Sequence, residues 1–107
     1  MKKGDIILVP FPFTDLSGNK LRPALVLVSG ATDVTVAFIT TQIRWKETHD
    51  TIITPAKENG LKQESLIRLS KLATIDSDLV DGILGEIDAA RMQEVNQNLL
   101  EILRLHE

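Results

Sequence analysis

The stretch RPALVLVSGATDVTVAFIT, residues 22–40, decides how this sequence folds. It contains two runs of β-branched and aliphatic residues, at 22–28 and 34–40, separated by a turn-forming segment at 29–33. Residues of this kind fit the pleated, half-buried surface of a sheet. Pro23 is tolerated because it stands at the start of its run. The stretch therefore predicts two strands joined by a short turn.

Shorter apolar runs on either side of this stretch indicate further strands. They lie at 5–13, 51–54, 65–72 and 83–87. Turn-forming residues separate them, most clearly in the loop at 14–20, which carries Asp, Ser, Gly and Asn. Two prolines in the first run, Pro10 and Pro12, indicate a sheet edge or a bulge at that point.

The hydrophobic period changes at the end of the chain. Asp88 is a good N-cap for a helix that begins after it. Apolar residues then recur every three or four positions, at Met92, Val95, Leu99, Ile102 and Leu103. This spacing predicts one apolar face of a helix of about four to five turns. Short strands followed by a helix indicate a mainly β fold with α, a twisted barrel with the helix packed on it, and the length suits one domain over residues 1–107.

The composition excludes several classes of site. The chain has no cysteine, so disulfides and thiolate metal sites are excluded and a reducing compartment is the simplest setting. A two-histidine ribonuclease site is not expected, because His49 lies in a polar loop and His106 lies beside the C-terminus. Asp76, Asp78 and Asp81 lack the glycine turn and closing glutamate of a calcium loop, so we expect no metal and no cofactor. The N-terminal apolar run is too short for a signal or membrane segment, which predicts a cytoplasmic protein.

The charge of the chain is unevenly distributed. The net charge is −3, but residues 1–72 carry ten Lys or Arg against seven Asp or Glu. Residues 73–107 carry two Lys or Arg against eight Asp or Glu. Two interpretations stay open: an ordinary acidic helix exposed to solvent, or a protein with one mildly basic face and one that repels anions.

Two short motifs have the residue types that contact anionic ligands. Arg22 stands where the turn-rich loop becomes a strand, so it could reach into a groove while the loop closes over a ligand. Thr40, Thr41 and Gln42 end the strongest strand and could hydrogen-bond a phosphate or a base edge. On the residues alone, an ordinary arginine at a strand start and ordinary β-branched residues remain the simpler interpretations.

Several motifs also follow one another in a distinctive order. They are GDIILVPF (4–11), RPALVL (22–27), ITTQI (39–43), SLIRLSKL (65–72), TID (74–76) and LG (84–85). Each motif is weak by itself. Their ordered combination, completed by the terminal helix, resembles the MazF/PemK family of toxins from type II toxin–antitoxin systems along nearly the whole chain.

The resemblance implies a fold, an activity and partners. The fold is a small SH3-like β-barrel with a C-terminal helix, assembled as a homodimer. The activity is metal-independent, sequence-specific endoribonuclease cleavage of single-stranded RNA, chiefly messenger RNA, by attack of the 2′-hydroxyl, with no cofactor. Arg22 and Thr40 match the catalytic Arg and Thr of the family. The partners are single-stranded RNA and a cognate antitoxin protein that occupies the same groove, without a membrane.

Further RNA-binding residues are expected around Arg22 and Thr40. The family's mobile loop matches residues 14–21, and the end of the strongest strand and the later strand supply the rest. Trp45 is expected either to stack on a base or to be a partly buried surface residue. The full expected set is Asp15, Ser17, Lys20, Thr41, Gln42, Arg44, Trp45, Lys46, Arg68, Ser70 and Lys71.

Two positions depart from the family pattern. Some relatives carry Arg-x-Asp on the later strand, where the pair is assigned as acid and base, but here Arg68 is followed by Ser70. Ala73 stands where relatives often have a basic residue. The proton acceptor is therefore unassigned, with Asp15 and His49 as open alternatives. Two other functions also stay open: a topoisomerase poison that acts by binding protein, and a member that binds its antitoxin but has lost catalysis.

Overall fold

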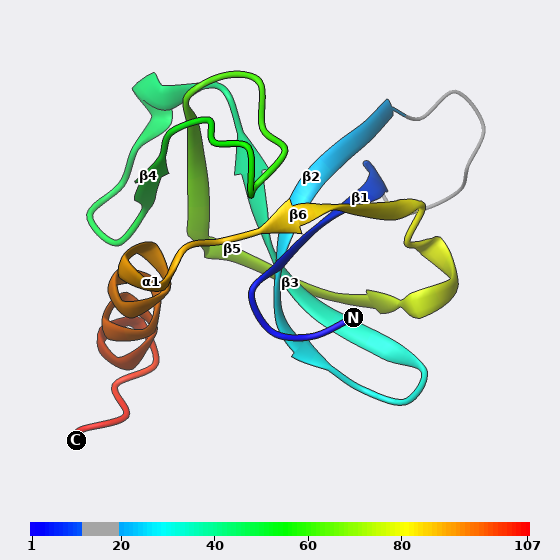
Figure 1. Cartoon of the computed structure of the whole chain (residues 1–107). Helices are drawn as coiled ribbons and strands as arrows, with labels where there is room; N and C mark the ends of the chain where they lie inside the picture. Colours follow the sequence, from blue (N-terminus) through cyan, green and yellow to red (C-terminus); the bar gives the residue numbers. More distant parts are fainter. Residues whose placement is uncertain (12–19) are drawn as a thin grey trace.

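The computed structural model describes residues 1–11 and 20–107. The mainly β fold with a C-terminal helix is confirmed (Figure 1). The elements, in chain order, are β1 (Asp5–Phe11), β2 (Lys20–Ser29), β3 (Asp33–Thr40), the 3₁₀ helix η1 (Ile43–Trp45), β4 (Thr51–Ile53), β5 (Ser65–Asp76), the 3₁₀ helix η2 (Ser77–Leu79), β6 (Gly82–Glu86) and α1 (Ala89–Ile102).

The strands form one curled antiparallel sheet with the order β4-β5-β3-β2-β1-β6. The loop after β4 reaches the far edge of this sheet, where the backbone N–H of Glu86 donates to the carbonyl of Glu58 at 2.8 Å. Glycine is required for this approach, because a Cβ on Gly85 would lie 2.1 Å from the carbonyl oxygen of Glu58. Gly60, with φ +70°, faces the carbonyl of Leu84 in the same way. The sheet is therefore a half-barrel whose open side is bridged by a loop.

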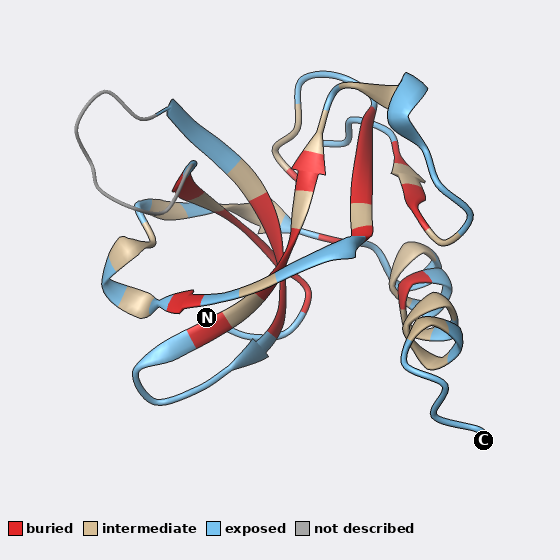
Figure 2. Cartoon of the chain, turned by 180° about the vertical axis from the view of Figure 1, so that it is seen from behind, coloured by how far each residue is buried: buried red, intermediate tan, exposed pale blue. Residues whose placement is uncertain are grey.

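Both faces of the curled sheet are buried. In β2, Leu25 and Leu27 belong to the apolar cluster that also includes Val95 of α1, whereas Ala24 and Val26 belong to a second cluster on the opposite face. Buried segments occur in strands β1 to β5 (Figure 2). A strand with two buried faces reads as a continuous apolar run, which explains the sequence of residues 24–27; Val28, the next residue, is exposed.

Helix α1 packs as its hydrophobic period predicts. The Asp88 side chain accepts a hydrogen bond of 3.1 Å from the backbone N–H three residues ahead, which confirms the N-cap. Val95 is fully buried in the core. Three further residues of the same face are partly buried against that core: Met92, Leu99 and Ile102. Leu103 does not belong to this face, because it lies after the end of α1 and its side chain is exposed. None of the helices in the described residues has the length and apolar character needed to cross a membrane.

One expectation about the strands needs correction, and another is confirmed. The strand expected over 65–72 continues to Asp76, whose side chain then accepts a hydrogen bond from the N–H of Asp78 at 2.8 Å and caps η2. The edge expected at Pro10 is confirmed at that point: β1 lies between β2 and β6, but β6 pairs only as far as Leu8, so Pro10 pairs with β2 alone and removes no hydrogen bond to β6. Pro12 lies outside the described residues.

Candidate functional site

A cavity of about 430 Å³ lies between the ends of β1 and β2 and the neighbouring parts of β3 and β5. Its lining comes from these four strands and from the segment that follows β3: Phe11, Arg22, Phe38, Ile39, Thr40, Thr41, Gln42, Trp45, Arg68 and Lys71. Seven of these residues were singled out by the sequence: Arg22, Thr40, Thr41, Gln42, Trp45, Arg68 and Lys71. The structure therefore brings both candidate motifs and part of the later strand into one site.

Arg22 is placed near the start of β2. It pairs with Val9 of β1, whereas the pairing of β2 with β3 begins only at Ala24. Its side chain is exposed, and within the described part of the chain its guanidinium makes no hydrogen bond or ion pair. The five N–H donors of this planar group are therefore available to a ligand in the cavity.

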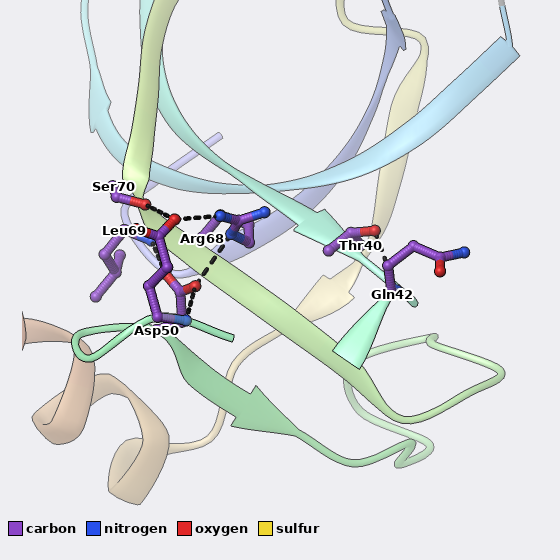
Figure 3. A network of polar contacts seen from close by, with 7 residues as sticks. Thr40, Gln42, Asp50, Arg68, Leu69 and Ser70 are labelled. Carbon is purple, nitrogen blue, oxygen red and sulfur yellow. Dashed lines mark hydrogen bonds and ion pairs between the residues drawn. The ribbon is translucent and has the colours of Figure 1, made fainter. Parts of the chain in front are cut away.

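Thr40 ends β3 with its hydroxyl already oriented. Its Oγ1 accepts a hydrogen bond of 3.1 Å from the backbone N–H of Gln42, the residue that precedes η1 (Figure 3). A hydroxyl has a single hydrogen, and this contact uses only an oxygen lone pair. The hydrogen of the Thr40 hydroxyl is therefore left to donate into the cavity.

Arg68 lies on β5 opposite Phe38 of β3, and two carboxylates hold its guanidinium in place. Its Nε is 3.0 Å from Oδ2 of Asp50, and its Nη2 contacts Oε1 of Glu47 (Figure 3). The contact with Asp50 is an ion pair without hydrogen-bond geometry. The Arg68 side chain is only 12% exposed.

Asp50 is anchored as firmly as the arginine that it holds. Its side chain is completely buried, and its oxygens accept backbone N–H groups of Leu69 at 3.1 Å and Glu47 at 2.9 Å. A buried charge is tolerated only when it is paired and hydrogen-bonded in this way. The bond from Leu69 ties the loop before β4 to β5, and the bond from Glu47 closes the loop on itself, so the carboxylate that faces the Arg68 guanidinium is fixed in place.

Aromatic residues form the apolar part of the cavity. The rings of Phe11 and Phe38 meet edge to face, with centroids 5.2 Å apart and an interplanar angle of 74°. Trp45 is half exposed, and the guanidinium of Arg44 lies 5.8 Å from its ring centroid. The sequence analysis missed both phenylalanines. The twofold period of a strand could have found Phe38, because it projects from the same face as Thr40 two residues later.

The other predicted site residues lie elsewhere. Lys20 is exposed at the start of β2, and Arg44 contacts Trp45 without lining the cavity. Lys46 and Ser70 line a second cavity, of about 460 Å³, together with Glu47, Thr48, His49 and Ile102. Asp15 and Ser17 lie outside the described residues. His49 is in the second cavity, with its Nε2 3.7 Å from Oε2 of Glu101.

The cavity carries positive charge of two kinds. Arg22 and Lys71 are exposed cations, whereas Arg68 is balanced by Glu47 and Asp50. Across residues 1–11 and 20–107, no group of three His, Cys, Asp or Glu side chains is placed to hold a metal ion. The site therefore combines exposed cations, a hydroxyl donor and aromatic surface, which suits an anionic ligand that carries flat apolar rings.

The described chain is thus a curled half-barrel with a terminal helix and a cationic cavity at its strand ends. The chain matches the family described as PemK-like, MazF-like toxin of type II toxin–antitoxin system over residues 2–103. The protein therefore belongs to this toxin family.

Solved structures share the fold. The chain is similar to an endoribonuclease in complex with its cognate antitoxin from Mycobacterial species, with a TM-score of 0.74, 20% identity, and 98% of this chain and 96% of that chain covered. It is similar to the Mycobacterium tuberculosis toxin MazF-mt6, with a TM-score of 0.76, 23% identity and coverage of 94% and 96%. It is also similar to MazF from Deinococcus radiodurans, with a TM-score of 0.74, 19% identity and coverage of 97% and 96%. No curated protein sequence matches the chain.

Proposed function

We propose that this protein is a toxin that cleaves single-stranded RNA at short sequences without a metal ion. It acts in the cytoplasm as a homodimer and is inhibited by a cognate antitoxin. One observation carries the proposal: in a chain of this toxin family, the exposed guanidinium of Arg22 and the oriented hydroxyl of Thr40 line the same cavity.

RNA supplies its own nucleophile, so the protein needs only to stabilise charge and move protons. The 2′-oxygen attacks the adjacent phosphorus, and negative charge grows on the non-bridging oxygens. Arg22 meets two of these oxygens with a planar fork, and the Thr40 hydroxyl donates one further hydrogen bond. Preorganised donors of this kind are each worth roughly 10²–10³ in rate. The products are a 2′,3′-cyclic phosphate and a free 5′-hydroxyl.

The cavity also suits bases and an inhibitor. Phe11, Phe38 and Trp45 offer aromatic surface on which unstacked bases can lie, as single-stranded RNA requires. An endoribonuclease of the same fold has been solved in complex with its cognate antitoxin. We propose that an acidic segment of the antitoxin of this protein covers Arg22 and Lys71 and so competes with RNA.

The test is cleavage of a labelled single-stranded RNA by the purified protein, with and without EDTA. We expect cleavage in both cases, with cyclic phosphate ends. Thr40→Ala should lower the rate by about 10²-fold, because it removes a single donor from the charged transition state. Intact RNA, or cleavage that EDTA abolishes, would contradict the proposal.

A further inference from the structure

The proposed reaction needs a group that accepts the proton of the 2′-hydroxyl. The described residues that line the main cavity include arginine, lysine, threonine and glutamine, but no carboxylate and no imidazole. Neither arginine nor threonine accepts a proton at neutral pH. Among the described residues, a proton acceptor for this site can only come from a side chain next to this lining.

Three candidates among the described residues lie around Arg68, and they differ in how far their side chains are exposed. Asp50 is completely buried, and its oxygens accept two backbone N–H groups and face the Arg68 guanidinium. His49 faces the second cavity and lies 3.7 Å from Glu101 of α1. Glu47 differs from both, because its side chain is 57% exposed.

Glu47 also stands in the right place. Its Oε1 contacts Nη2 of Arg68 and accepts a hydrogen bond from Oγ of Ser70 at 3.4 Å. Arg68 lines the main cavity, and the Glu47 carboxylate that contacts its guanidinium lies next to that lining, in the second cavity together with Ser70. Because Asp50 holds Arg68 through Nε, a phosphate in the main cavity and the Glu47 carboxylate can meet the same guanidinium. Two groups that accept from one guanidinium lie close to each other. The 2′-hydroxyl of a nucleotide lies next to its 3′-phosphate, so a carboxylate that shares Arg68 with the phosphate also lies close to the 2′-hydroxyl.

We propose that Glu47 is the general base of this protein. The assignment rests on the proposed RNA cleavage. A Glu47 oxygen takes the proton of the 2′-hydroxyl while the 2′-oxygen bonds to phosphorus and the bond from phosphorus to the 5′-oxygen breaks. The 5′-oxygen takes a proton from water in the open groove, and the Glu47 carboxylic acid returns its proton to solvent. On β5, no carboxylate follows Arg68 before Asp76. The loop before β4 supplies one instead, because Glu47 lies beside Ser70.

The charged groups around Glu47 define how the reaction responds to pH. Arg68 of β5 contacts the carboxylate directly, and Lys46, His49 and Asp50 come from its own segment. Only the ionised carboxylate accepts a proton, so general-base catalysis predicts a cleavage rate that rises from acid to neutral pH.

The deciding experiment uses Glu47→Gln, with single-turnover cleavage and RNA affinity measured from acid to neutral pH. General base catalysis is worth about 10²–10⁴-fold, so we expect the rate to fall by at least about 10²-fold and its rise with pH to disappear. RNA should bind as tightly or more tightly, because a negative charge is removed beside Arg68. Glu94→Gln, on the exposed side of α1 where Glu94 pairs with Arg91, is the matched control and should cleave at the parental rate.

A second variant moves the carboxylate from position 47 to position 70. Ser70 Oγ lies 3.4 Å from the Glu47 oxygen, so Ser70→Asp in the Glu47→Gln background should restore cleavage and its rise with pH. If the parent cleaves RNA and Glu47→Gln keeps the parental rate and pH profile, the assignment is overturned while the proposed function stands. If the parent leaves RNA intact, the proposed function fails and this assignment fails with it.

Discussion

Arg22 and Arg68 line the same cavity but differ in what holds them. Arg22 is exposed near the start of β2 and has no polar partner among the residues described, whereas Arg68 is 12% exposed and paired with Glu47 and Asp50. The first arginine offers its charge to a ligand, and the second has its charge balanced and its direction fixed. Residue type and location in a cavity therefore do not define a role, because the neighbours of each guanidinium decide it.

Replacing the exposed arginine should have the largest effect on activity. We expect Arg22→Ala to lower RNA cleavage by roughly 10²–10³-fold, or about 3–4 kcal/mol of transition-state stabilisation. The free energy of unfolding should change by no more than about 0.5 kcal/mol, because the described structure gives Arg22 no partner to lose. Arg22→Lys should rescue poorly, since an ammonium keeps the charge without the fork. Parental cleavage by Arg22→Ala, measured on the same RNA, would remove the catalytic assignment.

Replacing the held arginine should also lower the stability of the fold. Arg68→Ala leaves the buried Asp50 carboxylate without its cation, and we expect the free energy of unfolding to fall by about 3 kcal/mol. Lys71→Ala is the matched control, because Lys71 lines the same cavity from the same strand but is exposed. Denaturant unfolding measures both variants. An equally small loss in the two would show that Asp50 and Arg68 do not hold each other.

Truncating a residue on the apolar face of α1 should lower the free energy of unfolding by less than the loss of Arg68. Leu99 is partly buried against the cluster that contains Val95, so Leu99→Ala should lower the free energy of unfolding by about 2 kcal/mol, at the lower end for a core leucine. Leu105, after the end of α1, is 64% exposed, and Leu105→Ala should change stability by less than about 0.5 kcal/mol. Indistinguishable losses in chemical denaturation would contradict the packing of α1.

Asp5 forms an ion pair with the exposed Lys2, which is a weaker version of the pairing between Asp50 and Arg68. Removing it should have the smallest effect on stability of the changes considered. Burial raises the pKa of the Asp5 carboxyl, but the side-chain and backbone hydrogen bonds from Lys2, both 2.9 Å, and the Lys2 charge outweigh it, so the pKa is lowered. A lowered pKa in the folded state stabilises the protein above the unfolded-state pKa of about 4 and loses this effect as the pH falls through the folded-state value.

Asp5→Asn should therefore lower the free energy of unfolding by about 1 kcal/mol at pH 7, the scale of one hydrogen bond. The difference from the parent should shrink as the pH falls below about 4, where the parent carboxyl becomes neutral as well. Urea unfolding at several pH values makes the comparison. A difference that stays constant down to acid pH would show that the Lys2 contacts do not lower the pKa of Asp5.

Short-range patterns in the sequence were sufficient to predict much of the fold. The β-branched runs of β2 and β3 and the period of α1 with its Asp88 cap are short-range patterns, and all three are confirmed. The position of β1 between two strands was not predictable from Pro10, because it depends on how far β6 pairs along its partner. Likewise, β5 extends to Asp76 because Asp33 at the start of β3 pairs with it across the sheet.

The site was predicted less completely, because it depends on contacts between distant segments. The sequence places Asp50 in a polar stretch and gives no sign that it is buried, since burial requires Arg68 eighteen positions later. The same contact brings Glu47 beside Ser70, so a carboxylate missing from one strand is found on another segment. The roles of Arg22 and Thr40 came from the family resemblance rather than from the residues, and they remain predictions.

The loop after β4 meets β6 through a backbone hydrogen bond, from the N–H of Glu86 to the carbonyl of Glu58. The open side of the half-barrel is therefore closed by main-chain atoms. Gly60 and Gly85 are required there, because the chains approach too closely for a Cβ. The buried Asn59 between Glu58 and Gly60 holds the loop itself: its side chain accepts from the backbone N–H groups of Ala56 and Leu61 and donates to the carbonyl of Thr54. An alanine at position 85 would force the two chain segments apart, so the closure of the half-barrel depends on a position that carries no side chain.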